Sequence, residues 1–171
     1  MRSAAIGFDP VAAFLMGVNV LKIVVSACLM GEDCKYNGLD NYAAALVEAV
    51  ERTGTEVVLV CPEMFGGLPC PREPAEIVNG VVRDRTGKVV DDAFRRGARR
   101  ALDICAQAGG PCEIAFCVLQ DRSPSCGVDR IYDGSFSGKL VPGNGVFADA
   151  LVAEGYRVVP ISEFEPQMLG A

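Results

Sequence analysis

The chain has 171 residues, of which 50% are hydrophobic, and it carries a net charge of −6 with an isoelectric point near 4.7. This composition suits one domain with a substantial core, and it argues against a nucleic-acid or membrane-surface binder, which normally presents a basic surface. Histidine is absent, which excludes the serine-type triad, His-containing metal sites and the commonest general base.

The N-terminal segment, residues 1–17, is predicted to be a poorly ordered appendage or a mis-assigned start, with the globular domain spanning residues 18–171. Asp9 and Lys22 interrupt the apolar residues here, so no uninterrupted run is long enough to cross a bilayer. We therefore expect a cytoplasmic protein without a membrane partner. Its eight cysteines are expected to be reduced or metal-bound rather than paired in disulfides.

Strands alternate with helices along the rest of the chain. Runs of β-branched and apolar residues predict strands over 20–26, 56–60, 114–119 and 156–161. Capping residues and glycines predict helices from Asp40 or Asn41 to about Thr53, from Asp91 or Asp92 to Ala108, and from Gly143 or Asn144 to Glu154. This alternation implies an α/β fold with a mostly parallel sheet of about four to five strands.

Smaller features lie between these elements. A hairpin over 81–90 is expected to turn at Thr86-Gly87, and a glycine-rich stretch over 131–138 reads as hairpin-like. The second helix carries the main basic cluster, which is expected to be a solvated face rather than a nucleic-acid site: Arg95, Arg96, Arg99 and Arg100.

The proline-rich stretch 60–76 directly follows the second strand. That strand must stop at Cys61, because Pro62 has no N–H for a ladder hydrogen bond. Four prolines stiffen the loop that follows. A stiff loop that presents the thiol of Cys61 and the carboxylate of Glu63 suggests a site. A rigid surface connection with a buried cysteine is an equally compatible interpretation.

Three cysteines follow three of the predicted strands: Cys28, Cys61 and Cys126. Ligands of parallel α/β sheets bind outside the carboxyl ends of the strands, so we expect these thiols to meet at one edge. Three thiolates are one short of a closed zinc or iron–sulfur site, and a cubane cluster on three cysteines leaves one iron open as a Lewis acid. Cys34 or Cys70 could instead supply a fourth ligand.

Two further cysteines are expected to pack in the hydrophobic core rather than to bind a ligand. Cys105 lies within a predicted helix and Cys117 within a predicted strand. A free cysteine at such a position is usually a small buried hydrophobe, and we expect that role for both.

The chain is similar to the TudS-like (thiouracil desulfidase-like) domain family over about Lys22 to Glu163. The motifs that carry the resemblance are V-S-A-C-L-M-G at 25–31, C-K-Y-N-G at 34–38, C-P-E-x-x-G-G-L-P-x-P-R-x-P-A-E at 61–76, S-P-S-C-G at 123–127 and I-Y-D-G-x-F-x-G at 131–138. The resemblance implies a single Rossmann-like, three-layer domain that holds a 4Fe–4S cluster on Cys28, Cys61 and Cys126. It also implies an enzyme whose partner is a small thiolated pyrimidine base.

The expected reaction is a non-redox desulfuration that releases hydrosulfide. Glu63 is expected to activate a water as general base, and Ser123 to orient the water or the ring. The sequence is also compatible with two alternative functions. One is a zinc- or thiol-stabilised module that binds a small ligand without catalysis. The other is a sulfur carrier that receives a persulfide on Cys34 or Cys70.

Overall fold

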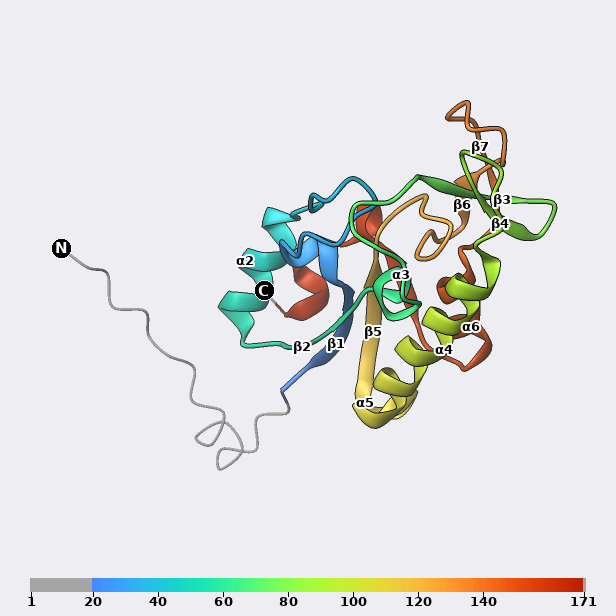
Figure 1. Cartoon of the computed structure of the whole chain (residues 1–171). Coiled ribbons are helices and arrows are strands. Elements are labelled where there is room, and N and C mark those ends of the chain that lie inside the picture. Colours follow the sequence, from blue (N-terminus) through green and yellow to red (C-terminus); the bar gives the residue numbers. More distant parts are fainter. Residues whose placement is uncertain (1–19, 171) are drawn as a thin grey trace.

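A four-stranded parallel sheet forms the centre of the molecule, in the order β2-β1-β5-β8 (Figure 1). The computed structural model describes residues 20–170, so the expected appendage lies outside the described residues. The strands are β1 (Lys22–Ser26), β2 (Glu56–Val60), β5 (Ile114–Leu119) and β8 (Val158–Pro160). All three pairings are parallel, which confirms the predicted α/β class and sheet type.

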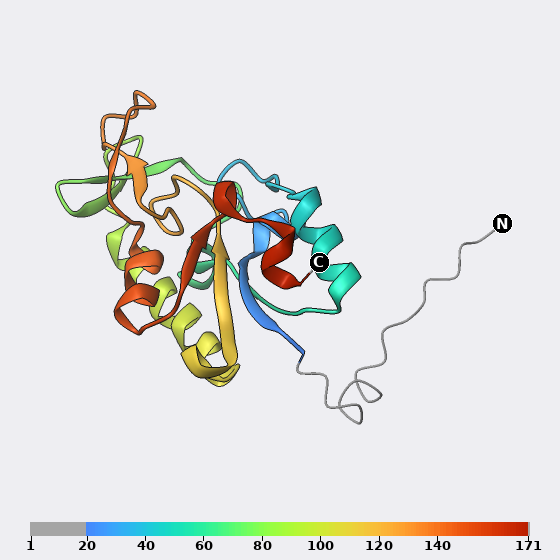
Figure 2. The same ribbon diagram turned by 180° about the vertical axis from the view of Figure 1, so that it is seen from behind.

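Helices cover both faces of the sheet and make three layers (Figures 1 and 2). One face packs against α2 (Ala44–Thr53) and the 3-10 turn η3 (Pro166–Leu169), and the other against α4 (Asp91–Gln107) and α6 (Val146–Ala153). Because strand side chains alternate, successive residues of β1 enter opposite cores. Ile23 belongs to the α2 side and Val24 to the α4 side. Within residues 20–170, no helix is both long and apolar enough to span a bilayer.

Helix α2 begins later than the predicted cap at Asp40 or Asn41. The Asp40 carboxylate accepts the Tyr42 N–H at 3.0 Å, which makes a turn ahead of the helix instead of a cap on it. The helix then starts at Ala44 and ends at the left-handed Gly54, as expected. Helix α4 matches its prediction to within one residue at its end.

Two hairpins extend beyond the carboxyl edge of the sheet, and each is a separate antiparallel pair. They are β3 (Ala75–Val78) with β4 (Val81–Asp84), and β6 (Arg130–Tyr132) with β7 (Leu140–Pro142). The predicted hairpin over 81–90 is present in short form. Across the turn at Thr86-Gly87, the Asp84 N–H donates to Lys88 O and the Val90 N–H to Val82 O, each at 3.0 Å, and Arg83 is bridged to Val89. The hairpin of β3 and β4 was not predicted. It turns at Asn79-Gly80, where both residues have positive φ, because Asn-Gly reaches that region at little strain.

Short helical turns complete the fold. They are η1 (Ala27–Met30), α3 (Pro62–Phe65), α5 (Gly110–Glu113) and η2 (Ile161–Glu163). The expectation of a plain loop after Cys61 is wrong for α3. Proline is well suited to the first helical position, where a missing N–H breaks no helical hydrogen bond. Pro62 therefore ends β2 and starts α3 in one step.

Candidate functional site

A cavity of about 430 Å³ opens at the carboxyl end of the sheet, between the strand ends and the two hairpins. The cysteines in its wall are Cys28, Cys34, Cys61 and Cys126. The charged side chains in its wall are Lys35, Glu63, Arg72, Glu76, Arg85, Asp121 and Arg122. This is the edge at which the topology predicts a ligand site.

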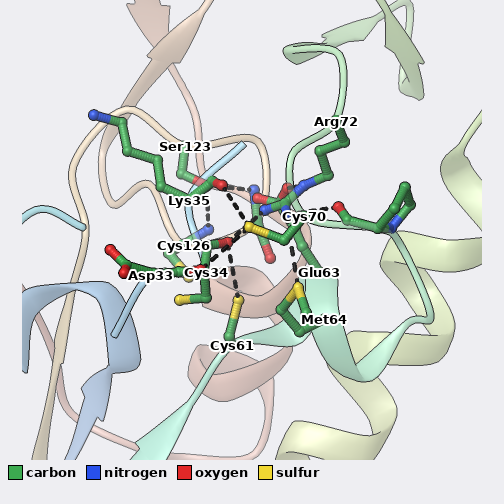
Figure 3. Close-up of polar contacts among 12 residues, drawn as sticks. Asp33, Cys34, Lys35, Cys61, Glu63, Met64, Cys70, Arg72, Ser123 and Cys126 are labelled. Atoms are coloured by element: carbon green, nitrogen blue, oxygen red, sulfur yellow. Dashed lines mark hydrogen bonds and ion pairs between the residues drawn. The ribbon is translucent and has the colours of Figure 1, made fainter. Parts of the chain in front are cut away.

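The three cysteines singled out by topology all reach this cavity. Cys28 lies in η1 directly after β1, Cys61 precedes α3 directly after β2, and Cys126 lies in the turn that follows β5. Cys34 joins them from the loop between η1 and α2. Cys70 does not line the cavity, because its Sγ contacts the carbonyl oxygens of Asp33 and Lys35 at 3.2 and 3.3 Å (Figure 3).

The remaining cysteines lie away from the cavity. Cys105 and Cys117 are fully buried in the core on the α4 side, as expected, and Cys112 is exposed. No disulfide joins any of the eight cysteines. Among residues 20–170, no three Cys, Asp or Glu side chains are grouped so as to hold a single metal ion.

Three of the cavity thiols are held in their neutral form. A hydrogen bond with Cys28, followed by burial, raises the pKa of Cys34 to about 11, although Cys61 opposes the shift. A hydrogen bond with Cys34 and burial also raise the pKa of Cys61. Burial raises the pKa of Cys126 to about 12. A metal that binds cysteine must displace these protons, so metal uptake and thiol deprotonation are linked at this site.

Glu63 and Arg72 form an ion pair in the wall of the cavity (Figure 3). Arg72 Nε donates to Glu63 Oε2 at 2.7 Å, and the two side chains are 8% and 17% exposed, Arg72 first. Arg72 also donates to the carbonyl oxygens of Cys34 at 3.0 Å and Pro69 at 3.2 Å. Burial raises the pKa of Glu63, and Arg72 opposes that shift. Within the described residues Glu63 Oε1 accepts no hydrogen bond, so it is available to a molecule in the cavity.

Ser123 has a structural role as well as a place in the cavity wall. Its Oγ accepts the backbone N–H groups of Ser125 at 3.0 Å and Cys126 at 3.1 Å. These bonds fix the turn that carries Cys126. They also occupy the oxygen as an acceptor and leave the hydroxyl proton free to donate. Ser123 is therefore placed to act as a donor toward a bound molecule rather than as a base.

Helix α3, which carries Glu63, rests directly on α4. A Cβ at Gly97 would overlap the carbonyl oxygen of Pro62, so only glycine allows this approach. Arg96 donates to Gly66 O and Arg100 to Phe65 O, each at 2.6 Å. The basic cluster is thus only partly the solvated face that was expected. Two of its four arginines bind the carbonyl end of α3.

The sequence indicated no role for Arg72 and only a helix cap for Asn41. Arg72 stands in the quoted motif at 61–76 together with its partner Glu63, which was the one available signal, but its other partner, the carbonyl oxygen of Cys34, comes from a distant segment. The Asn41 amide Nδ2 lies 3.8 Å from Cys28 Sγ, although the sequence favoured a capping role for this residue.

Comparisons with known proteins agree with this arrangement. A sequence model of a family described as 2-thiouracil desulfurase matches residues 23–163. The uncharacterized protein YbbK of Bacillus subtilis (strain 168) is 36% identical over 151 residues, which cover 82% of this chain and 96% of YbbK. A solved structure of a [4Fe-4S]-dependent thiouracil desulfidase, TudS, superposes with a TM-score of 0.76 at 37% identity, and covers 84% of this chain and 93% of that one.

Proposed function

We propose that this chain, which belongs to the 2-thiouracil desulfurase family and is an enzyme, removes sulfur from a thiolated uracil-type base. The proposed reaction is a hydrolysis that depends on an iron–sulfur cluster. The observation that carries the proposal is the meeting of Cys28, Cys61 and Cys126 with Glu63 around one cavity. The similarity to TudS, a [4Fe-4S]-dependent enzyme, supports the cofactor.

The residues in the cavity suit an iron–sulfur cluster. Thiolate is the usual protein ligand of such clusters, and three thiols arrive from three separate loops. Ser125 Oγ is buried beside Cys126 and has no hydrogen-bond partner in the described part of the chain, so a thiolate at Cys126 would give it one. We assign Cys28, Cys61 and Cys126 as the ligands. When bound, a cluster on three cysteines supplies an iron with an open position, a Lewis acid for which sulfur is a suitable ligand.

The reaction is a hydrolysis in which the thiocarbonyl and water become a carbonyl and hydrogen sulfide, with no net electron transfer. Glu63 takes a proton from water through the free Oε1, while Arg72 holds Oε2. The water oxygen forms a bond to the thiocarbonyl carbon, the carbon–sulfur bond breaks, and sulfur leaves with the bonding electron pair as hydrosulfide. Ser123 donates its hydroxyl proton in a hydrogen bond that orients the water or the ring.

Anaerobic purification followed by a visible spectrum, iron, sulfide and zinc analysis tests the cofactor. We expect a broad brown absorption with stoichiometric iron and sulfide, and hydrosulfide release when 4-thiouracil is added. A colourless protein that contains zinc would instead support a ligand-binding module. A metal-free protein that accepts sulfur as a persulfide would support a sulfur carrier.

Cys34 is the main alternative ligand, because it lines the same cavity and its carbonyl oxygen accepts a hydrogen bond from the Cys61 thiol at 3.9 Å. Replacing Cys28, Cys61 or Cys126 by Ser should reduce the iron content after reconstitution, whereas Cys34→Ser should retain it. Cys70→Ser is the matched control, since this thiol lies outside the cavity wall. Loss of iron in Cys34→Ser would show a four-cysteine site without an open iron.

A further inference from the structure

Hydrogen-bond donors surround the sulfurs of the three proposed ligands, and they come from different parts of the fold. At Cys28 the donor is the Asn41 amide, whose Nδ2 lies 3.8 Å from Sγ. At Cys61 the backbone N–H of Met64 in α3 opposes the rise in the pKa of the thiol. At Cys126 the hydroxyls of Ser26 and Ser125 both lie close enough to act on the thiol.

Two of these donors have no other hydrogen-bond role. Ser125 is 1% exposed, and its Oγ makes no hydrogen bond to any described residue. A buried hydroxyl without a partner is costly, so it usually marks a group that is missing from the site. Asn41 Nδ2 contacts only the Cys28 sulfur among the described residues. Ser26, in contrast, also accepts the Gln120 N–H at 3.1 Å, which ties it to the backbone.

We infer that Asn41 and Ser125 are positioning residues that donate hydrogen bonds to the Cys28 and Cys126 sulfurs when these bind the cluster. The inference rests on the proposed function, because it requires that the two cysteines ligate iron as thiolates. A thiolate is a better acceptor than a thiol, so both donors gain strength when the cluster is loaded.

These bonds have a definite electronic consequence. A hydrogen bond to a cysteine sulfur draws negative charge away from the iron and stabilises the more negative, reduced state of the cluster. Asn41 and Ser125 should therefore raise the reduction potential of the cluster. They should also make the open iron a stronger Lewis acid, which is the property that a non-redox desulfuration requires.

The test is the midpoint potential of the reconstituted protein, measured by anaerobic redox titration with visible and EPR detection. Asn41→Leu keeps the branched shape of the side chain without the donor, and Ser125→Ala removes only the hydroxyl. Each should shift the midpoint to a more negative potential, with iron content retained. The double variant should show the sum of the two shifts, because the donors act on different sulfurs.

Two matched controls separate donor loss from general disturbance. Asn37→Ala removes an amide of the same loop that bonds only to the Leu39 N–H among the described residues. Thr55→Val removes a buried hydroxyl that pairs with Thr53 just before β2, at the end of the strand away from the cavity. Neither should shift the potential.

Unchanged potentials in Asn41→Leu and Ser125→Ala, with the cluster intact, would overturn the inference. Loss of the cluster in either variant would also overturn it, because a donor that tunes the cluster is not needed to hold it. The potential can be measured without turnover. A wild-type protein that holds a cluster but releases no sulfide from 4-thiouracil would therefore refute the proposed activity and leave this comparison valid. A wild-type protein that binds no cluster would refute both.

Discussion

Arg72 should contribute far more to stability than an ordinary surface arginine, because it neutralises a carboxylate in the cavity wall. Breaking a buried ion pair from one side typically costs about 3–5 kcal/mol, since the other charge is left without a partner. Both side chains are less than one-fifth exposed, so solvent screening reduces this figure only in part. We therefore expect Arg72→Met to lower the free energy of unfolding of the metal-free protein by about 3 kcal/mol, a large share of the 5–15 kcal/mol typical of a domain.

A double-mutant cycle with Glu63→Gln isolates the pair from the other contacts of Arg72. Arg72→Met leaves a buried carboxylate unpaired when Glu63 is present, but it leaves only a neutral amide when Glu63→Gln has been made first. The double variant should therefore lose less than the sum of the single variants. The expected coupling is about 1–3 kcal/mol.

Urea unfolding of reduced, metal-free protein, followed by far-UV circular dichroism, gives the four free energies. Arg85→Met is the matched control: this arginine also lines the cavity, but it is exposed, and its loss should change stability by no more than about 0.5 kcal/mol. Additive single losses, with unchanged urea dependence, would refute an energetically coupled pair.

Three further predictions concern catalysis and packing. Glu63→Gln should retain the cluster but slow anaerobic hydrosulfide release from 4-thiouracil by about 10²–10⁴-fold, because an amide cannot act as a base; near-normal release would remove Glu63 from the mechanism. Gly97→Ala should destabilise the protein by about 1–3 kcal/mol in urea and reduce its iron content, since a Cβ overlaps Pro62 O, whereas the exposed Asp103→Ala on the same helix should do neither. Cys105→Ala and Cys117→Ala should keep full iron content and lose only packing stability; iron loss in either would show that the assigned ligand set is wrong.

The sheet and the meeting of the three thiols were predictable from local patterns. The run Glu56–Val60 forms the strand that its β-branched residues predict, with both ends as expected. Parallel order then fixes which edge receives Cys28, Cys61 and Cys126, and the cavity lies at that edge. One local signal was overlooked, since Asn79-Gly80 is a stronger hairpin turn than Thr86-Gly87.

The partners of the polar side chains could not be predicted, because they depend on contacts between distant segments. Arg96 and Arg100 read as surface charge on an amphipathic helix, yet they bond to carbonyl groups about thirty residues earlier in the chain. Asparagine is a residue type that often caps helices, but the Asn41 amide contacts Cys28 in η1. The sequence pattern indicates which residues lie at the carboxyl edge of the sheet. It does not indicate which polar side chain donates a hydrogen bond to a given cysteine sulfur.

The contact between α3 and α4 also affects how the site is assembled. A helix of only four residues is not stable on its own in water. Contacts with α4 at Gly97, Arg96 and Arg100 therefore keep α3 folded. The chain has already lost the conformational entropy of this turn before iron and sulfide arrive, and loading the site does not have to supply it. Opening of α3 then requires that it separate from a core helix. Its amide protons should consequently exchange with solvent on the timescale of the core rather than that of a surface turn.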